Sequence, residues 1–153
     1  MEMRNLAKEA VLIEENATFR EALSLMMHRD TNSLFVVNTD GVLIGEVNVS
    51  DLLDAIVPMD VAGDTIESQL GSEDAFGNAV LSASDLPVSA FLNPEIHPVR
   101  ADDSLIAIAG VAIAHQTAHL PIVDHDDRPV GVISRRALKH ILASFLDIQK
   151  TLD

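Results

Sequence analysis

Residues 11 to 56 are repeated by residues 97 to 142 at a constant offset of 86, with no insertion or deletion. Few aligned pairs are identical, but the spacing of apolar residues and of turn signals repeats as well. The pairs that mark the repeat are Thr18 with Ser104, Thr31 with Thr117, Leu34 with Leu120, Val37 with Val123, Asp40 with Asp126, Gly45 with Gly131 and Leu52 with Leu138. Two copies of one unit predict a pseudo-symmetric pair, and clefts between such halves often bind small ligands.

Composition and charge narrow the class of protein. Of 153 residues, 48% are hydrophobic, which predicts a packed core and not a disordered acidic chain. No apolar run approaches the ~18 residues that span a bilayer. The first ten residues lack a signal-peptide core and cysteine is absent, so we expect a cytoplasmic protein. The net charge of −14 repels phosphate backbones and anionic lipid, which argues against nucleic-acid and membrane partners.

The residue pattern predicts a β-α-β-β-α order in the first half. Thr18 and Glu21 form a capping-box pattern before a helical spacing of apolar residues, and Ser50 suits the cap of a helix that begins near Asp51. The expected strands are residues 11–13, 34–37 and 42–47, with a turn at 38–41.

The second half predicts the same order. Its expected strands are 97–99, 120–123 and 129–133, with a capped helix at 105–114 and a final helix from Arg136 towards Leu152. Between the halves, apolar residues in 58–86 are spaced as in short amphipathic helices, and a short helical turn is expected at 87–89. We therefore divide the chain into a first motif (1–58), a helical insertion (59–86) and a second motif (87–153).

Two stretches of the second half, 119–124 and 129–134, have counterparts at 33–38 and 43–53. In this order they resemble a tandem pair of cystathionine-β-synthase-type (CBS) domains, or Bateman module, over about Asn5 to Leu146. The resemblance implies an α/β (α+β) fold in which two β-α-β-β-α motifs pack as a pseudo-two-fold pair. It leaves no room for a catalytic domain, so no enzyme activity is expected.

The resemblance also implies a regulatory function. Many such pairs form homodimers and bind AMP, ADP, ATP or S-adenosyl compounds in the inter-motif clefts. They then signal to a partner protein, here unknown, without a required cofactor. A ligand-free dimerisation or docking scaffold is the alternative, and a hydrolase is a weaker one because no Ser/His/Asp grouping is readable.

The ligand pattern of the family is Gly, two residues, Ser or Thr, two residues, then Asp. The first copy matches it with Gly45, Asn48 and Asp51, and the second with Gly131, Ser134 and, in place of Asp, Ala137. In this pattern the carboxylate accepts hydrogen bonds from ribose hydroxyls, while the hydroxyl and the helix N-terminal amides face a phosphate. We expect one competent adenosine cleft around Asp51 and a weak or empty cleft around Ser134.

The residues expected in the competent cleft are Asn48, Ser50, Asp51, Ile96, His97, Ala118 and His119. Those expected in the weaker cleft are Ala10, Val11, Asn32, Ser33, Ser134, Arg135 and Arg136. Arg135 and Arg136 could hold a phosphate or a partner carboxylate. His119, if partly protonated near its reference pKa of about 6.5, could make binding sensitive to pH.

Each of these residues also has a simpler interpretation. Asp51 suits the first turn of a helix because it complements the helix dipole. His119 could be an ordinary strand-edge histidine, and the two arginines could be solvated or paired locally. His115 and His119 have the spacing of a helical metal pair, but a strand that starts at Leu120 argues that the helix has already ended. The acidic residues 124–127 are expected to form a turn and not a calcium loop.

Overall fold

The computed structural model describes residues 7–57, 73–117 and 119–148. These residues belong to two compact units, one made of Val11–Ile96 and the other of His97–Asp153 together with Met1–Ala10. Each unit contains one copy of the repeat. Among the described residues, no helix is both long and apolar enough to cross a membrane.

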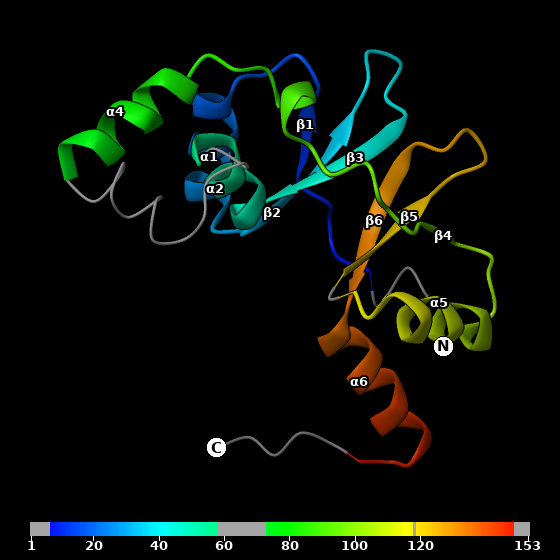
Figure 1. The fold of residues 1–153 in the computed structure, drawn as a ribbon. Coiled ribbons are helices and arrows are strands. Elements are labelled where there is room, and N and C mark those ends of the chain that lie inside the picture. The colour runs from blue at the N-terminus through cyan, green and yellow to red at the C-terminus, as the bar shows by residue number, and fades with distance from the viewer. Residues whose placement is uncertain (1–6, 58–72, 118, 149–153) are drawn as a thin grey trace. The chain divides into compact units, whose positions relative to one another are not determined.

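The first unit contains a three-stranded sheet in the order β1-β2-β3. β1 pairs parallel with β2, and β2 pairs antiparallel with β3. The elements are β1 (Leu12–Glu14), α1 (Phe19–Arg29), β2 (Ser33–Val37), β3 (Leu43–Asn48), α2 (Val49–Ile56), α4 (Glu73–Ala83) and the 3₁₀ turn η2 (Val88–Ala90). The three helices lie together beside the sheet (Figure 1). The core between them is apolar, and Leu34, Val36, Val47 and Val88 are fully buried.

The second unit repeats this arrangement with the strand order β4-β5-β6. Its elements are β4 (Val99–Arg100), α5 (Leu105–His115), β5 (His119–Val123), β6 (Pro129–Ser134) and α6 (Arg135–Phe145). The register repeats too, since Ser33 pairs with Asn48 and His119 pairs with Ser134, each 86 residues further on. The predicted pair of β-α-β-β-α motifs is confirmed, and Figure 1 shows β5 and β6 as a hairpin that leads into α6.

The first helix of each motif starts and ends with the expected local chemistry. Thr18 and Glu21 form the predicted capping box on α1, and Ser104 caps α5 through a hydrogen bond from the Ala107 N–H of 3.1 Å. Both helices end in a left-handed residue, Asp30 at φ 50° and Gln116 at φ 48°. α5 therefore ends before β5 begins, which removes the helical spacing of His115 and His119.

Each sheet is extended by one residue that precedes the first strand of a motif, Lys8 before β1 and Asn93 before β4. Lys8 exchanges two backbone hydrogen bonds of 2.9 Å with Val132 in β6, and Asn93 exchanges bonds of 2.8 and 2.9 Å with Glu46 in β3. A glycine precedes each contacted residue. A Cβ at Gly45 would lie 2.7 Å from the Asn93 carbonyl oxygen, and one at Gly131 would lie 3.2 Å from the Lys8 carbonyl oxygen. These glycines therefore allow a close approach of backbone to backbone.

Most element boundaries shift by one residue from the sequence prediction, and three differences affect its interpretation. α2 begins at Val49 with Asn48 as its cap, because the Asn48 side chain accepts the Asp51 N–H; Ser50 lies inside the helix and does not cap it. α6 ends at Phe145, earlier than predicted, and Asp147 there has a φ of 55°. β4 covers Val99–Arg100 and not residues 97–99. Within the range expected for the insertion, the structure has the helix α4 (Glu73–Ala83), while residues 58–72 lie outside the described part of the chain.

Candidate ligand-binding site

Asn48 and Asp51 hold each other at the start of α2. The Asn48 Oδ1 accepts a 3.1 Å hydrogen bond from the Asp51 N–H, and the Asp51 Oδ2 accepts a 2.8 Å bond from the Asn48 N–H. This reciprocal capping box satisfies two amides that a helix start leaves without partners. It uses one oxygen of the carboxylate and the oxygen of the carboxamide. The second carboxylate oxygen and the Asn48 amide nitrogen are outside the box, so they can receive a ligand.

The electrostatics around Asp51 are unfavourable to negative charge. Burial raises the pKa of Asp51 above its ordinary value, and Asp54 raises it further, while the hydrogen bond from Asn48 acts in the opposite direction. Burial likewise raises the pKa of Glu46 on β3, with Asp51 as the second cause. A ligand that donates hydrogen bonds to these two carboxylates would lower their pKa values again, because such bonds favour the charged form.

The equivalent position in the second motif has a hydroxyl and no carboxylate. Ser134 caps α6 by accepting a 3.1 Å hydrogen bond from the Ala137 N–H. The methyl side chain of Ala137 cannot accept a hydrogen bond in return, so no capping box forms here. Arg135 donates from Nε to the Thr117 carbonyl oxygen at 3.3 Å and from Nη2 to the Gln116 carbonyl oxygen, at the C-terminal end of α5. Arg135 is thus already engaged with backbone oxygens of its own unit.

His119 lies beside two cations of its own unit. Its imidazole is partly desolvated, and Lys8 and Arg135 add positive charge nearby, so the pKa of His119 lies below its ordinary value of 6.5. Burial and these two cations therefore oppose protonation of His119, which runs against the expectation of a partly protonated ring. The backbone N–H of His119 is oriented by Thr117, as that of Ser33 is by Thr31.

The structure places the other predicted residues as follows. Ser50 is exposed on the first turn of α2. Ile96 ends the first unit and His97 begins the second, where the His97 ring stacks on His115 with centroids 3.3 Å apart and planes 6° apart. Ala118 lies outside the described residues. Arg136 is exposed on α6, Asn32 precedes β2, and Ser33 is the first residue of β2.

Ala10 and Val11 precede β1, where the Val11 carbonyl oxygen accepts a hydrogen bond from the Phe35 N–H. Within each unit, cross-strand pairing puts Ser33 beside Asn48 and His119 beside Ser134. Sequence reasoning assigned the two members of each pair to different clefts. It also missed Lys8 and Asn93, although Gly45 and Gly131 gave a signal for a close strand neighbour.

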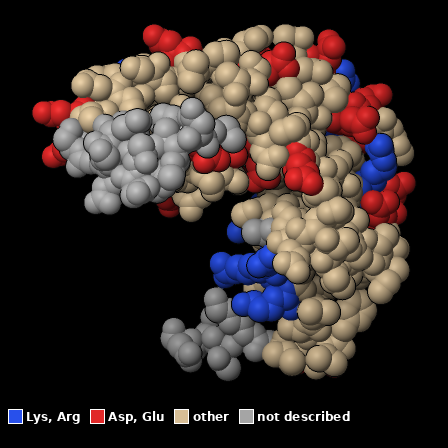
Figure 2. All heavy atoms as spheres, in the orientation of Figure 1, with Lys and Arg blue, Asp and Glu red and all other residues tan. Residues whose placement is uncertain are grey.

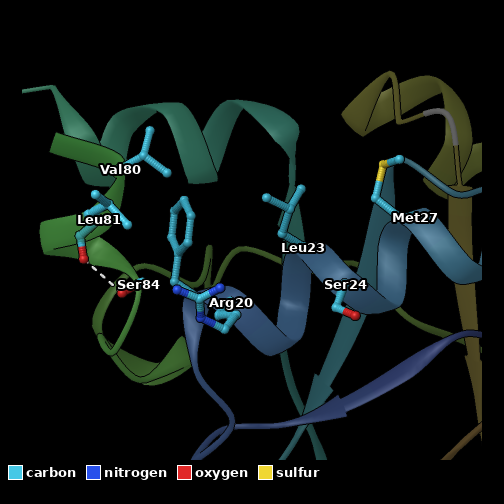
Figure 3. Close-up of a pocket in the computed structure, with 8 residues that line it drawn as sticks. Arg20, Leu23, Ser24, Met27, Val80, Leu81 and Ser84 are labelled. Atoms are coloured by element: carbon cyan, nitrogen blue, oxygen red, sulfur yellow. Dashed lines mark hydrogen bonds between the residues drawn. The ribbon is translucent and has the colours of Figure 1, made fainter. Parts of the chain in front are cut away.

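An open hollow of about 430 Å³ lies away from these residues, between α1 and α4. Figure 3 shows Leu23 and Met27 of α1 on one side and Val80 and Leu81 of α4 on the other, with Arg20 at the near edge. The lining is mostly apolar. Among the described residues, no group of three or more His, Asp or Glu side chains is arranged to hold a metal ion.

The sequence model of the CBS domain matches residues 4–58 and 88–144, and these ranges correspond to the two motifs. The chain belongs to the CBS domain family. As a CBS pair it is 26% identical, over 135 residues, to the transcriptional repressor CcpN of Bacillus subtilis (strain 168). That match covers 88% of this chain and 55% of the repressor, so the CBS pair spans about half the length of this curated relative.

Solved structures share the fold. A CBS-domain protein of unknown function from Kribbella flavida superposes with a TM-score of 0.78 at 19% identity, over 94% of this chain and 99% of that one. The CBS pair of protein MJ0100, in complex with 5′-methylthioadenosine and S-adenosyl-L-methionine, gives 0.65 at 14% identity over 95% and 98%. The cytosolic domain of the Mg²⁺ channel MgtE, in complex with ATP, gives 0.65 at 20% identity over 92% and 48%.

Proposed function

We propose that this CBS pair is a regulatory module that binds an adenosine-containing ligand, AMP, ADP, ATP or an S-adenosyl compound, through the motif that carries Asp51. Ligand binding would then be passed to a partner protein. CBS pairs are generally regulatory modules and not catalysts, and two structural relatives hold such ligands. A homodimer and a cytoplasmic location belong to the same proposal.

The observation that most directly supports this proposal is the geometry of Asp51. The capping box with Asn48 fixes the carboxylate on the first turn of α2 and leaves one oxygen for a ribose hydroxyl. The helix N-terminus and the Asn48 amide supply donors for an anionic group in a chain whose net charge is −14. The equivalent Ala137 has no carboxylate, which supports a single strong site per chain.

The alternative is a ligand-free scaffold. The capping box favours it too, because Asn48 and Asp51 then have a structural role without any ligand. The two functions differ in one observable, which is whether an adenosine compound stabilises the folded state through Asp51.

Calorimetric and thermal-shift titrations with AMP, ADP, ATP, S-adenosylmethionine and NAD test the proposal. We expect one of them to bind wild-type protein and to bind Asp51→Ala about 10- to 100-fold more weakly, because hydrogen bonds to a charged group contribute ~1.5–3 kcal/mol each. Asp54→Ala is the matched control, since it removes an exposed carboxylate from the same helix. Absence of binding by all five at millimolar concentration would leave the scaffold as the function.

A further inference from the structure

The two units of this chain differ strongly in charge. The first unit, residues 11–96, has 15 acidic and 2 basic side chains, a net charge of −13. The second unit, residues 1–10 and 97–153, has 9 acidic and 8 basic side chains, a net charge of −1. Figure 2 shows Lys and Arg side chains gathered over α6. The acidity of the chain is therefore a property of the first unit.

The division is clearest on two helices that occupy the same place in the repeat. On α2 the exposed stripe consists of Val49, Ser50, Leu53 and Asp54. On α6 the residues 86 positions later are also exposed, and they are Arg135, Arg136, Lys139 and His140. Residues with this spacing share one helix face. One face is thus apolar and acidic in the first copy and basic in the second.

The basic stripe borders an apolar surface. An open hollow of about 620 Å³ is lined by Arg136, Lys139, His140, Leu142, Ala143, Leu146 and Ile148. Leu142 is 69% exposed and Leu146 is 71% exposed. Arg100 pairs with Asp127 and Arg128 with Asp126 in the described part of this unit, and neither ion pair involves Arg136 or Lys139. An apolar patch with charges at its border is typical of a protein-binding surface.

We infer that two copies of this chain associate through unlike helices, with α6 of one copy against α2 of the other. The inference rests on the homodimer in the proposed function and adds which surfaces meet. In a two-fold pair of like helices, each basic stripe would face itself, and like charges across an interface are strongly unfavourable. In the unlike pair, Asp54 faces basic residues and Leu53 faces the apolar surface that Leu142 and Leu146 expose.

We take the partner of α6 to be a second copy of this chain, because every copy carries an α2 helix that complements α6. α2 is acidic, has two exposed apolar side chains, and carries no basic residue. Each copy holds one helix of each kind, so two copies supply both members of the contact.

Cross-linking between single-cysteine variants tests the pairing, because the chain has no native cysteine. Leu53→Cys and Lys139→Cys replace exposed residues on the two stripes. Native mass spectrometry of the wild type first establishes the dimer, and a short bismaleimide is then added to each variant alone and to their equilibrated mixture. We expect covalent dimers in the mixture and none in either variant alone.

The opposite results overturn the inference. Cross-linking of either variant alone means that like helices meet, and a dimer without any cross-link means that other surfaces meet. A monomeric wild type, or a complex with a different acidic protein only, removes the homodimer as well. The nucleotide titrations described above test the ligand proposal, and their result does not depend on these cross-linking outcomes.

Exchanging the charges of the stripes on α6 and α2 provides a second test of the pairing. Arg136→Glu with Lys139→Glu is expected to weaken the dimer at least about tenfold, since it brings acids against Asp54. Adding Asp54→Lys to the same chain restores the unlike pairing and the dimer. The exchanged chain is expected not to mix with the wild type. Mixed dimers in the mass spectrum would show like pairing and contradict the inference.

Discussion

The first and second CBS motifs share the β-α-β-β-α order and the same strand register, yet they differ at residues beside a neighbouring strand and at the residues proposed to bind a ligand. An added Cβ would meet closer neighbours at Gly45 than at Gly131. Glu46 corresponds to Val132, and Asp51 corresponds to Ala137. Backbone pairing and apolar packing require only a pattern of residue types. Binding requires particular atoms, so the two copies can diverge in chemistry while they keep one fold.

The largest difference is expected from the two glycines. Gly45→Ala places a Cβ 2.6 Å from Leu92 Cδ1 and 2.7 Å from the Asn93 carbonyl oxygen. We expect a loss of about 1–3 kcal/mol in unfolding free energy, because overpacking against backbone is relieved only by moving a strand. Gly131→Ala is expected to cost less than about 1 kcal/mol, since its nearest contact is 3.2 Å. Urea denaturation measures both. Equal losses would show that the two sheets tolerate the added Cβ alike.

The ligand chemistry of the two motifs can be equalised by Ala137→Asp. The new carboxylate would stand at the helix position of Asp51 and could complete a capping box with Ser134. If Asp51 determines which motif binds, we expect the calorimetric stoichiometry to rise from about one to about two ligands per chain. An unchanged stoichiometry would indicate that residues other than the carboxylate distinguish the motifs. Ser144→Asp, late on the same helix, is the control for added charge.

The helix caps should differ by a smaller amount. Asn48→Ala removes one partner of a reciprocal box, whereas Ser134→Ala removes a single accepted hydrogen bond. We expect losses of about 1–2 kcal/mol for Asn48→Ala and about 0.5–1 kcal/mol for Ser134→Ala. Thermal unfolding in the absence of ligand measures this. A larger loss for Ser134→Ala would contradict the ranking.

The smallest effect is a pH dependence that arises from Glu46, which corresponds to Val132 in the second motif. The pKa of Glu46 is raised by burial and by Asp51, so the ionised form is less favourable in the folded than in the unfolded chain. This penalty is present at neutral pH and fades as the pH falls through the raised pKa and below the ordinary value of 4.5. Glu46→Gln is therefore expected to raise the melting temperature slightly at pH 7 and to have little effect at pH 4. Val132→Ala in the second motif should show no such pH trend.

Much of the fold was predictable because it follows from local signals. The repeat, the capping box of Thr18 and Glu21, the cap at Ser104 and the turn after β2 are all readable within a few residues of sequence. The start of α2 was misplaced because Asn48 and Ser50 are both good caps. Only the hydrogen bond to the Asp51 N–H selects Asn48. α6 was predicted too long because nothing in the sequence before Asp147 signals the end of the helix.

The residues of the candidate site were proposed from the sequence, whereas the surroundings of their side chains could not be read from it. The positions of Asp51 and Ser134 followed from the resemblance to CBS domains. The lowered pKa of His119 did not, because it depends first on burial and then on Lys8, which is far away in sequence and pairs with β6. Similarly, Arg135 looked free for an anion until the structure placed its guanidinium on the carbonyl oxygens that end α5.

The amino-acid sequence is sufficient to identify a CBS pair with a repeated scaffold, because the constant offset of 86 and the residue at each repeated position can be read directly from it. The partners of those residues follow only from the folded structure. It places Asn93 against Glu46 and Lys8 against Val132, leaves no room for a Cβ at Gly45 and little at Gly131, and sets basic and acidic stripes on equivalent helix faces. Strand pairing and solvent exposure depend on contacts between distant segments, and these exist only once the chain is folded.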